Sequence, residues 1–295
     1  MDRNARVLVA GATGYLGRNI AVALHDAGFR VRALARDPRR LDPIRPACDE
    51  VFVGAATRPE TLAGLCDDVD VVVSSVGLRT LRGKPTPEQV DLGANLNILA
   101  RAREAGVGRF LFVSVLHAAE LAERVPILRP REEFTHRLVD SGLTWTVLRP
   151  TGAFNDMAEI FRLAARGAGM VFGDGRYRIN PVHPRDIGDL VAESIRDSAL
   201  VDQEFGFGGP DTYTAAEIVE LAQRVLGRRR RPWHLPYWPV EALSAALRPI
   251  NRNASGFLRF FCESLGRDMV GTPIGQRHLV DYFAALAAGT DTGSR

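Results

Sequence analysis

Three glycines stand at regular spacing directly after a short apolar run, at Gly11, Gly14 and Gly17. The run before them has the length and β-branched content of a buried strand, and the residues after them have helical period. Glycine at these positions permits a tight turn, a close approach of the backbone to a phosphate and close packing of the helix on the strand. The free amides and the positive end of the helix dipole then attract an anion. An ordinary strand-to-helix turn is the alternative, but strand, helix and the strands that follow all favour a dinucleotide site, with these predicted contacts: Gly11, Thr13, Gly14, Tyr15, Leu16 and Gly17.

The residue after the second strand distinguishes the two nicotinamide dinucleotides. A fold that prefers NAD carries an acidic residue there to hold the ribose hydroxyls. Arg36 occupies this position, and a guanidinium fits a 2′-phosphate, although Asp37 beside it is a contrary sign. Arg36, Arg39 and Arg40 could instead form a solvated basic loop. The sequence favours NADPH or NADP+, and NADH stays possible.

Short β-branched runs alternate with helical segments through the first half of the chain, the pattern of parallel strands with crossover helices. We expect a Rossmann-type doubly wound α/β sheet over residues 1–150, because right-handed crossovers place such strands in one sheet. The expected strands are 7–10, 30–35, 51–53, 71–74, 110–114 and 145–148, and the expected helices are 17–27, 59–66, 88–105, 131–140 and 155–166.

After Pro150 the pattern changes to short strands mixed with helices, which predicts a smaller substrate-binding and lid lobe over 151–288. The expected strands are 170–172, 177–179 and 204–207, and the expected helices are 184–196, 215–226, 239–247 and 255–265. Thr214 and Glu217 form a capping box ahead of one of these helices, and Gly227 follows its last turn. Residues 289–295 are expected to form a flexible tail.

Composition excludes several classes of protein. The chain has 46% hydrophobic residues and a formal net charge of +3, with basic residues spread along its length, which is typical of a globular protein rather than a nucleic-acid binder. The densest basic run, 228–231, follows a helix end, where a solvated face is the simpler interpretation. Three cysteines without a CxxC pair and no long apolar run predict a cytoplasmic protein that binds no membrane, and no metal-ligand pattern occurs.

Several segments resemble the atypical short-chain dehydrogenase/reductase family, including its branch similar to the nitrogen-metabolite-repression regulator. They are GATGYLG, DVVVSSVG, FLFVSV and SGLTWTVLRP, and the segment NPVHPRD also resembles the family. The resemblance covers about the first two thirds of the chain. It implies that the following residues contact the cofactor: Ser74, Ser75, Val76, Ser114, Arg131, Pro150, Thr151, Gly152 and Phe154.

The family's reaction uses a serine that polarises the carbonyl, a tyrosine that donates the proton and a lysine four residues later. Ser114 matches the serine, whereas Ile127 falls on the tyrosine position and Arg131 on the lysine position. Isoleucine has no proton to give, and arginine is never deprotonated in proteins. This pattern resembles the tyrosine-lacking ketoreductases that tailor aromatic polyketides.

Two interpretations of this loss stay open at this point. In one, the chain is a reductase in which cofactor positioning supplies the catalysis, and a phenol of the substrate supplies the proton. In the other, it is a non-catalytic NADP(H) sensor, and an epimerase or lyase on the same scaffold is a further alternative. For a reductase, we expect a bulky aromatic substrate against apolar walls and a nearby histidine, at these residues: His117, Phe154, Met157, Phe161 and Tyr177. The sequence does not indicate the oligomeric state.

Overall fold

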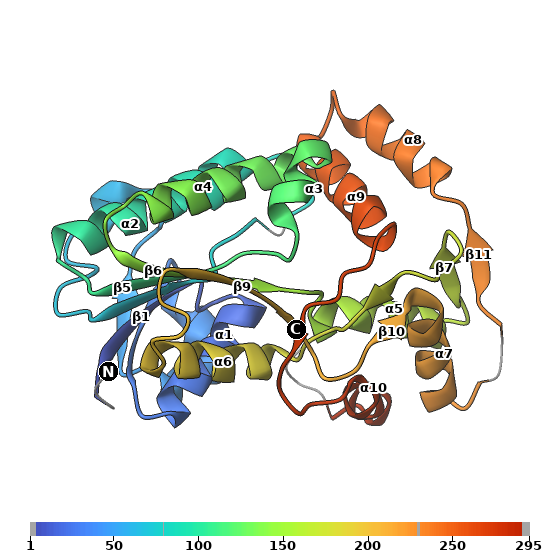
Figure 1. The fold of residues 1–295 in the computed structure, drawn as a ribbon, viewed down its shortest axis with the longest axis horizontal. Helices are drawn as coiled ribbons and strands as arrows, with labels where there is room; N and C mark the ends of the chain where they lie inside the picture. The colour runs from blue at the N-terminus through green and yellow to red at the C-terminus, as the bar shows by residue number, and fades with distance from the viewer. Residues whose placement is uncertain (1–3, 79, 229–230, 291–295) are drawn as a thin grey trace.

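The computed structural model of the chain describes residues 4–78, 80–228 and 231–290, and its centre is one eight-stranded sheet (Figure 1). Every neighbouring pair of strands runs parallel, in the order β12-β9-β6-β5-β4-β1-β2-β3. The strands are β1 (Arg6–Ala10), β2 (Arg30–Ala35), β3 (Glu50–Val53), β4 (Val71–Ser74), β5 (Arg109–Val113), β6 (Thr144–Pro150), β9 (Gln203–Gly208) and β12 (Thr272–Pro273). The chain changes direction across the sheet between β1 and β4, which is where such folds bind their ligands.

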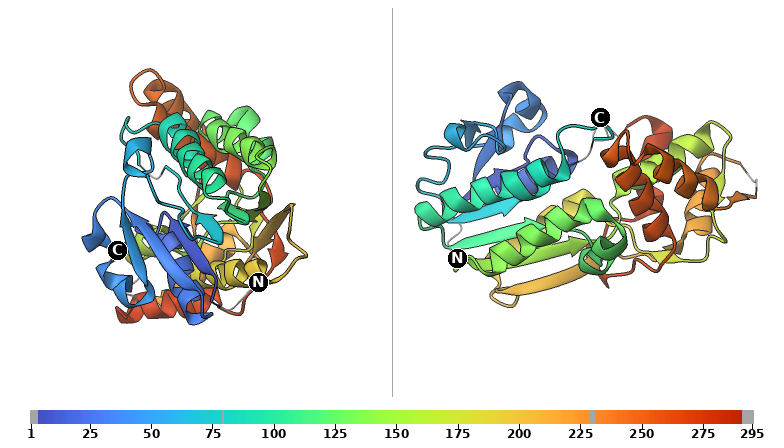
Figure 2. Two further views of the ribbon diagram at one scale, coloured as in Figure 1. Left: turned by 90° about the vertical axis from the view of Figure 1, so that its left-hand side faces the viewer. Right: turned by 90° about the horizontal axis from the view of Figure 1, so that it is seen from above.

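Helices cover both faces of this sheet (Figures 1 and 2). One face carries α1 (Tyr15–Asp26) and α6 (Pro184–Arg196), which bury Ile20 and Ile187 against the strands. The other carries α2 (Asn95–Glu104) and α4 (Arg129–Val139), which bury Ile98 and Phe134. Two apolar layers therefore enclose the strands, and the predicted Rossmann-type doubly wound fold is confirmed.

A helical lobe lies beyond the carboxyl ends of the strands, at the right of the view from above in Figure 2. Its core joins α5 (Phe154–Ala165), α7 (Ala215–Val225) and α10 (Leu279–Ala288). The other elements there are α3 (Ala118–Arg124), α8 (Trp238–Leu247), α9 (Arg252–Leu265) and the strand pairs β7 (Met170–Phe172) with β11 (Trp233–Leu235) and β8 (Arg178–Ile179) with β10 (Tyr213–Thr214). The C-terminal half also supplies β9 and β12 to the central sheet.

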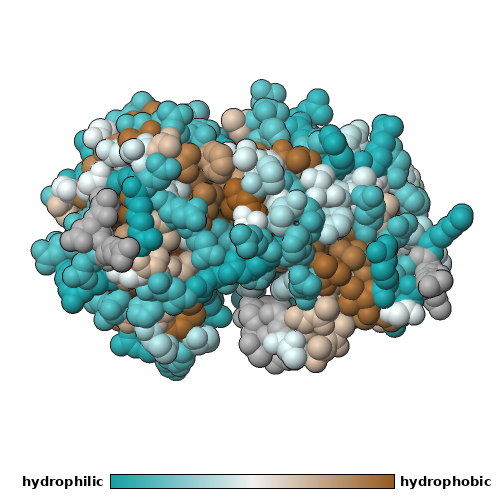
Figure 3. Space-filling model, turned by 60° about the horizontal axis from the view of Figure 1, so that its bottom comes forward, coloured by the Kyte–Doolittle hydropathy of each residue, from teal (hydrophilic) through white to brown (hydrophobic). Residues whose placement is uncertain are grey.

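The surface seen from below is mostly hydrophilic, with an apolar area on the side of the helical lobe (Figure 3). Across the described part of the chain, no helix combines the length and the apolar character that a membrane span requires.

Most expected elements are present, and the departures have local causes. The six expected strands of the first half form one sheet, and Thr214 caps α7 with Glu217 as predicted. The helix expected over 59–66 is wrong: only one 3-10 turn forms, Pro59–Thr61, and Gly64 takes a left-handed φ of 74° that ends any helix there. Helix α10 was not expected, and the tail residues 291–295 lie outside the described residues.

The packing of α1 on β1 depends on glycine. Gly11 has a φ of 90°, in the left-handed region that side chains rarely adopt. A Cβ on Gly17 would lie 2.2 Å from the carbonyl oxygen of Gly11, so only glycine lets the helix approach the turn this closely. The predicted packing role of Gly17 therefore has a direct steric basis.

Gly17→Ala is expected to lower the free energy of unfolding by about 1–3 kcal/mol, because the added methyl must displace backbone atoms. Urea denaturation measures the change. Gly83→Ala is the control, since nothing lies within 4 Å of its added Cβ and the expected change is within about 0.5 kcal/mol. Equal stability of Gly17→Ala and the natural protein would contradict the steric argument.

Candidate dinucleotide and reductase site

The glycine turn places the first turn of α1 where its amides can face an anion. The Gly14 amide donates to the Gly11 carbonyl oxygen at 2.8 Å, and Gly14 caps α1 without a side chain. The amides of Leu16 and Gly17 follow in the first turn of the helix, where no carbonyl of a preceding turn is available to them. No acidic residue stands in the first turn to oppose an anion. This geometry suits the pyrophosphate of a dinucleotide.

The end of β4 lies against the same turn. Ser75 donates its amide and its hydroxyl to the Ala10 carbonyl oxygen, at 3.0 and 3.3 Å. Ser74 is buried and donates to Asn95 Oδ1 at 2.6 Å, and its hydroxyl accepts the Val76 amide at 3.3 Å. Ser75 therefore lies against the glycine turn, and the Ser74 side chain holds the strand end to α2; cofactor contacts of Ser75 and Val76 stay a prediction.

At the end of β2, Arg36 is exposed and Asp37 is engaged elsewhere. The Asp37 carboxylate accepts two hydrogen bonds from the Arg39 guanidinium, both at 2.9 Å, and one from the Arg39 amide at 3.2 Å. The Arg39 side chain, with its hydrogen bonds and charge, holds the pKa of Asp37 below its usual value. The nearby carboxylate is therefore already paired, which lessens its conflict with a 2′-phosphate beside Arg36.

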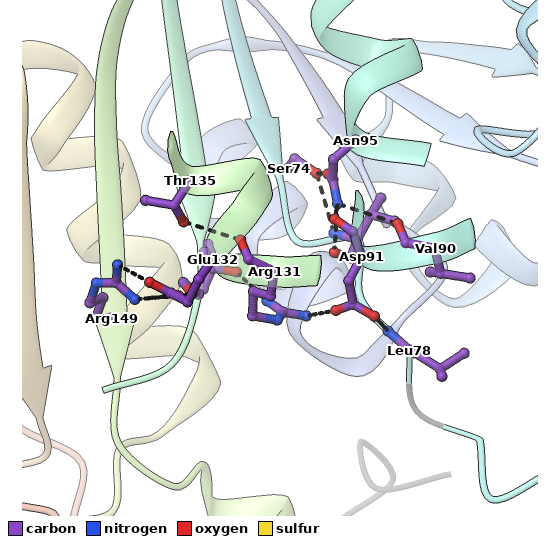
Figure 4. A network of polar contacts seen from close by, with 12 residues as sticks. Ser74, Leu78, Val90, Asp91, Asn95, Arg131, Glu132, Thr135 and Arg149 are labelled. Carbon is purple, nitrogen blue, oxygen red and sulfur yellow. Dashed lines mark hydrogen bonds and ion pairs between the residues drawn. The ribbon is translucent and has the colours of Figure 1, made fainter. Parts of the chain in front are cut away.

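Ser114 lies in a buried polar network at the end of β5, partly drawn in Figure 4. Arg149 on β6 and Glu132 on α4 form a bidentate pair with N–O distances of 2.8 and 2.9 Å. Ser114 Oγ lies 3.3 Å from Glu132 Oε1 and 3.3 Å from Arg149 Nη1. Arg149 also donates to Glu204 on β9 at 2.7 Å. Burial opposes the charge of Arg149, but its bonds to both glutamates raise its pKa above the usual value.

The neighbouring position on α4 is also held by an ion pair. Arg131 and Glu132 point to opposite sides of the helix in Figure 4. Arg131 binds Asp91 at 2.6 Å and donates to the Val113 carbonyl oxygen at 3.0 Å, with only 12% of its side chain exposed. A Cβ on Gly77 would lie 1.9 Å from Arg131 Nη2, so the loop after β4 fits closely around the guanidinium. At the lysine position there is thus a fixed cation beside the end of β5.

Ile127, at the tyrosine position, packs into an apolar cluster. It lies in the 3-10 turn Pro126–Leu128 and contacts the cluster that contains Leu116 and Val125. A Cβ on Gly256 of α9 would lie 2.0 Å from Ile127 Cγ2. This site therefore holds an apolar contact with the C-terminal helices and has no group that donates a proton.

The segment after β6 is fixed by main-chain hydrogen bonds. The Thr151 amide donates to the Phe207 carbonyl oxygen at 2.9 Å, and the Thr151 hydroxyl donates to that of Asn180 at 2.6 Å. The Val182 amide donates to the Gly152 carbonyl oxygen at 3.0 Å. Pro150 is buried at the end of β6 and leads directly into this segment. The predicted cofactor residues 150–154 thus lie on a rigid connection at the carboxyl edge of the sheet.

The residues predicted to contact substrate fall into two groups. His117 is half-buried, begins α3 with a left-handed φ of 54° and pairs with Glu120 at 3.2 Å, and Tyr177 is half-buried under Arg176. The other three are buried in the core of the helical lobe against α7 and α10: Phe154, Met157 and Phe161. Their contact with substrate stays a prediction, and their packing gives them a structural role.

Sequence reasoning missed the charged partners around these positions. They are Glu132 and Arg149 in the network around Ser114, and Asp91, which pairs with Arg131. One signal was present in the sequence, an arginine inside the mostly apolar strand that ends at Pro150. A buried charge must be paired, so Arg149 predicts a carboxylate nearby without saying which one. Among the described residues, no group of three or more metal-ligating side chains comes together.

Comparison with known proteins agrees with this site. Residues 11–198 match the NAD(P)H-binding family. A (4-alkanoyl-5-oxo-2,5-dihydrofuran-3-yl)methyl phosphate reductase from Streptomyces griseus is 32% identical over 228 residues, 76% of this chain and 75% of the relative. A photosystem II assembly factor from Synechocystis sp. is 26% identical over 232 residues, 78% of this chain and 71% of the relative.

Two solved structures show the same fold over nearly the whole chain. An NADPH-dependent quinone oxidoreductase from Escherichia coli, complexed with NADPH, has a TM-score of 0.73 at 17% identity, covering 95% of this chain and 99% of that chain. The leucoanthocyanidin reductase of Vitis vinifera, complexed with NADPH, has a TM-score of 0.74 at 16% identity, covering 96% and 100%.

The parallel sheet and the glycine turn define a Rossmann-type dinucleotide-binding protein. The chain belongs to the NAD(P)H-binding family. Its cofactor is therefore NAD(P)H, as predicted.

Arg149→Met is expected to lower the free energy of unfolding by about 3–5 kcal/mol, because Glu132 is left charged and buried without its partner. Glu132→Gln combined with Arg149→Met should recover much of this loss, since no buried charge remains between the two elements. Chemical denaturation measures both.

The matched control is Arg137→Met on α4, the helix that also carries Glu132. It removes an exposed pair with Glu133 that is expected to contribute less than about 1 kcal/mol. If Arg149→Met were as mild as Arg137→Met, the Glu132 pair would not hold β6 to α4.

Proposed function

We propose that this protein is an NADPH-dependent ketoreductase acting on a bulky aromatic small molecule, with the proton supplied by the substrate itself. The observation that carries the proposal is the combination of a glycine turn suited to a dinucleotide with a tyrosine position occupied by Ile127 and a lysine position occupied by the paired Arg131. Hydride transfer needs the cofactor and a positioned carbonyl, and a protein acid is needed only where the product alkoxide has no other proton source.

The proposed step balances within cofactor and substrate. When bound, NADPH supplies a hydride to the carbonyl carbon and becomes NADP+. The carbonyl oxygen gains the electron pair of the broken π bond and takes the proton of an adjacent phenol through an internal hydrogen bond. The phenolate is then reprotonated by water.

In this scheme the chain's own residues position the substrate and polarise its carbonyl group. Ser114 is the proposed group beside the carbonyl, held by Glu132 and Arg149. Arg131 donates to the carbonyl oxygen of Val113, the last residue of β5, and its positive charge is proposed to favour negative charge on the reacting oxygen. His117 and Tyr177 are the proposed substrate contacts, because both are partly exposed.

The substrate class follows from the proton source. An aromatic ketone with a neighbouring phenol, as in polyketides of the angucyclinone type, meets the requirement. The loss of the tyrosine also resembles the simocyclinone angucyclinone ketoreductase, which favours a role in tailoring an antibiotic polyketide. The Streptomyces griseus relative is named as a reductase of a conjugated, acylated ring, which supports chemistry on a small carbonyl compound.

A second candidate is a non-catalytic NADP(H) sensor. It is favoured by the same two replaced positions, and by a relative that is named as an assembly factor rather than an enzyme.

The proposal predicts that NADPH is oxidised in the presence of an aromatic ketone with an ortho phenol. The meta-hydroxy isomer, which cannot form the internal hydrogen bond, and the ortho O-methyl ether should each react at least about a hundredfold more slowly, the lower end of the range expected for loss of a positioned acid. Absorbance at 340 nm follows the reaction, with a reaction lacking protein as control.

Other outcomes point elsewhere. Tight NADPH binding without oxidation across the panel would favour the sensor. Conversion of the substrate with no net change in NADPH would indicate an epimerase or lyase. Equal rates for the ortho and meta isomers would refute proton supply by the substrate while leaving a reductase.

A further inference from the structure

A cavity of about 270 Å³ lies beside the glycine turn, and one of its walls comes from the helical lobe. The turn and α1 supply one side, the loop after β2 supplies Arg40, and α5 supplies the opposite side. The lining residues are Thr13, Gly14, Tyr15, Arg18, Arg40, Asn155, Glu159 and Arg162. The three residues of α5 follow at spacings of four and three, so they share one face of that helix.

The charges of this lining suit an anion with several negative oxygens. Arg18, Arg40 and Arg162 line the cavity against a single carboxylate, that of Glu159. The positive end of the α1 helix dipole adds to this field. A pyrophosphate bound at the glycine turn would therefore meet cations on both walls.

Two buried polar atoms in this lining have no hydrogen-bond partner among the described residues. They are Arg18 Nε, a donor, and Asn155 Oδ1, an acceptor. A buried polar atom without a partner is rare, because losing its water is unfavourable unless another group replaces it. A ligand that both accepts and donates hydrogen bonds, as a phosphate next to a ribose hydroxyl does, would satisfy both.

Within the part of the chain that the structure describes, the side chain of Arg162 forms one local ion pair. Its partner is Glu159, three residues earlier on α5, and the two side chains are 37% and 72% exposed. An exposed pair of this kind contributes little, whereas an arginine–phosphate contact is charge-assisted and can be bidentate. Arg162 can thus leave Glu159 and bind a phosphate with little loss of stabilising free energy.

We propose that α5 forms the second wall of the dinucleotide site, with Arg162 binding the cofactor's pyrophosphate and Asn155 accepting a hydrogen bond from an adjacent ribose hydroxyl. Arg18 donates to the same pyrophosphate from the side of α1. Glu159 opposes the phosphate and competes for Arg162. This assignment depends on NAD(P)H binding alone and holds for a reductase and for a sensor.

The arrangement makes the cofactor a link between the two parts of the molecule. The opposite face of α5 packs Met157 and Phe161 against α7 and α10, so a contact at Arg162 reaches the core of the helical lobe. Bound NADPH should therefore slow amide exchange in α5.

The test compares dissociation constants of NADPH and NADH, measured by fluorescence titration, because both carry the pyrophosphate and only NADPH carries the 2′-phosphate. Arg162→Ala is expected to weaken both by about tenfold. Glu159→Gln is expected to strengthen both, since it frees Arg162 and removes the opposing charge. Arg166→Ala, an exposed arginine one turn further along and outside the cavity lining, should change neither.

The opposite signs distinguish a phosphate contact from a structural effect. Glu159→Gln removes only an exposed carboxylate, so its result stands even if Arg162→Ala folds poorly. Unchanged or weaker binding in Glu159→Gln would overturn the proposal. Weakening of NADPH alone in Arg162→Ala would place Arg162 at the 2′-phosphate and also overturn the assignment to the pyrophosphate.

Discussion

The buried pair of Arg149 and Glu132 joins β6 to α4 beneath the carboxyl edge of the sheet, and the geometry of the proposed reaction site depends on it. Two charges removed from water are tolerated only when each satisfies the other, and here both Arg149–Glu132 bonds are under 3 Å. The pair fixes the first turn of α4, and with it Arg131 on the other side of the helix. The same two side chains also hold the hydroxyl of Ser114 in place by hydrogen bonds.

This constraint gives a physical reason for the chemistry we propose. In the family's usual reaction a tyrosine donates the proton and a lysine follows four residues later. Here Arg131 is paired with Asp91, and Ile127 packs against α9. The polar groups here are engaged with one another in ion pairs and hydrogen bonds. A site of this kind can orient a cofactor and stabilise a developing oxyanion, but it must take the proton from elsewhere.

The sequence predicted the parts that local rules determine. Gly11 and Gly17 indicated the cofactor turn because the backbone there excludes side chains, and the alternation of β-branched strands with helices indicated the sheet. The network around Ser114 could not be predicted, because Glu132, Arg149 and Glu204 lie on three elements whose register only the tertiary structure sets. The α5 side of the cavity could not be predicted for the same reason, because it depends on tertiary structure. From the sequence alone Arg162 is a surface residue of an amphipathic helix, and only the fold brings that helix to the same cavity as α1.

The most direct test of the central claim is the pH dependence of kcat/KM for a series of ortho-hydroxy aromatic ketones whose phenols differ in pKa. This ratio reports the ionisations of the free protein and the free substrate. If the substrate supplies the proton, the upper limb of the profile should move with the phenol pKa from one substrate to the next. A limb that stays at one pH for all substrates would assign the proton to a group of the protein and contradict the account.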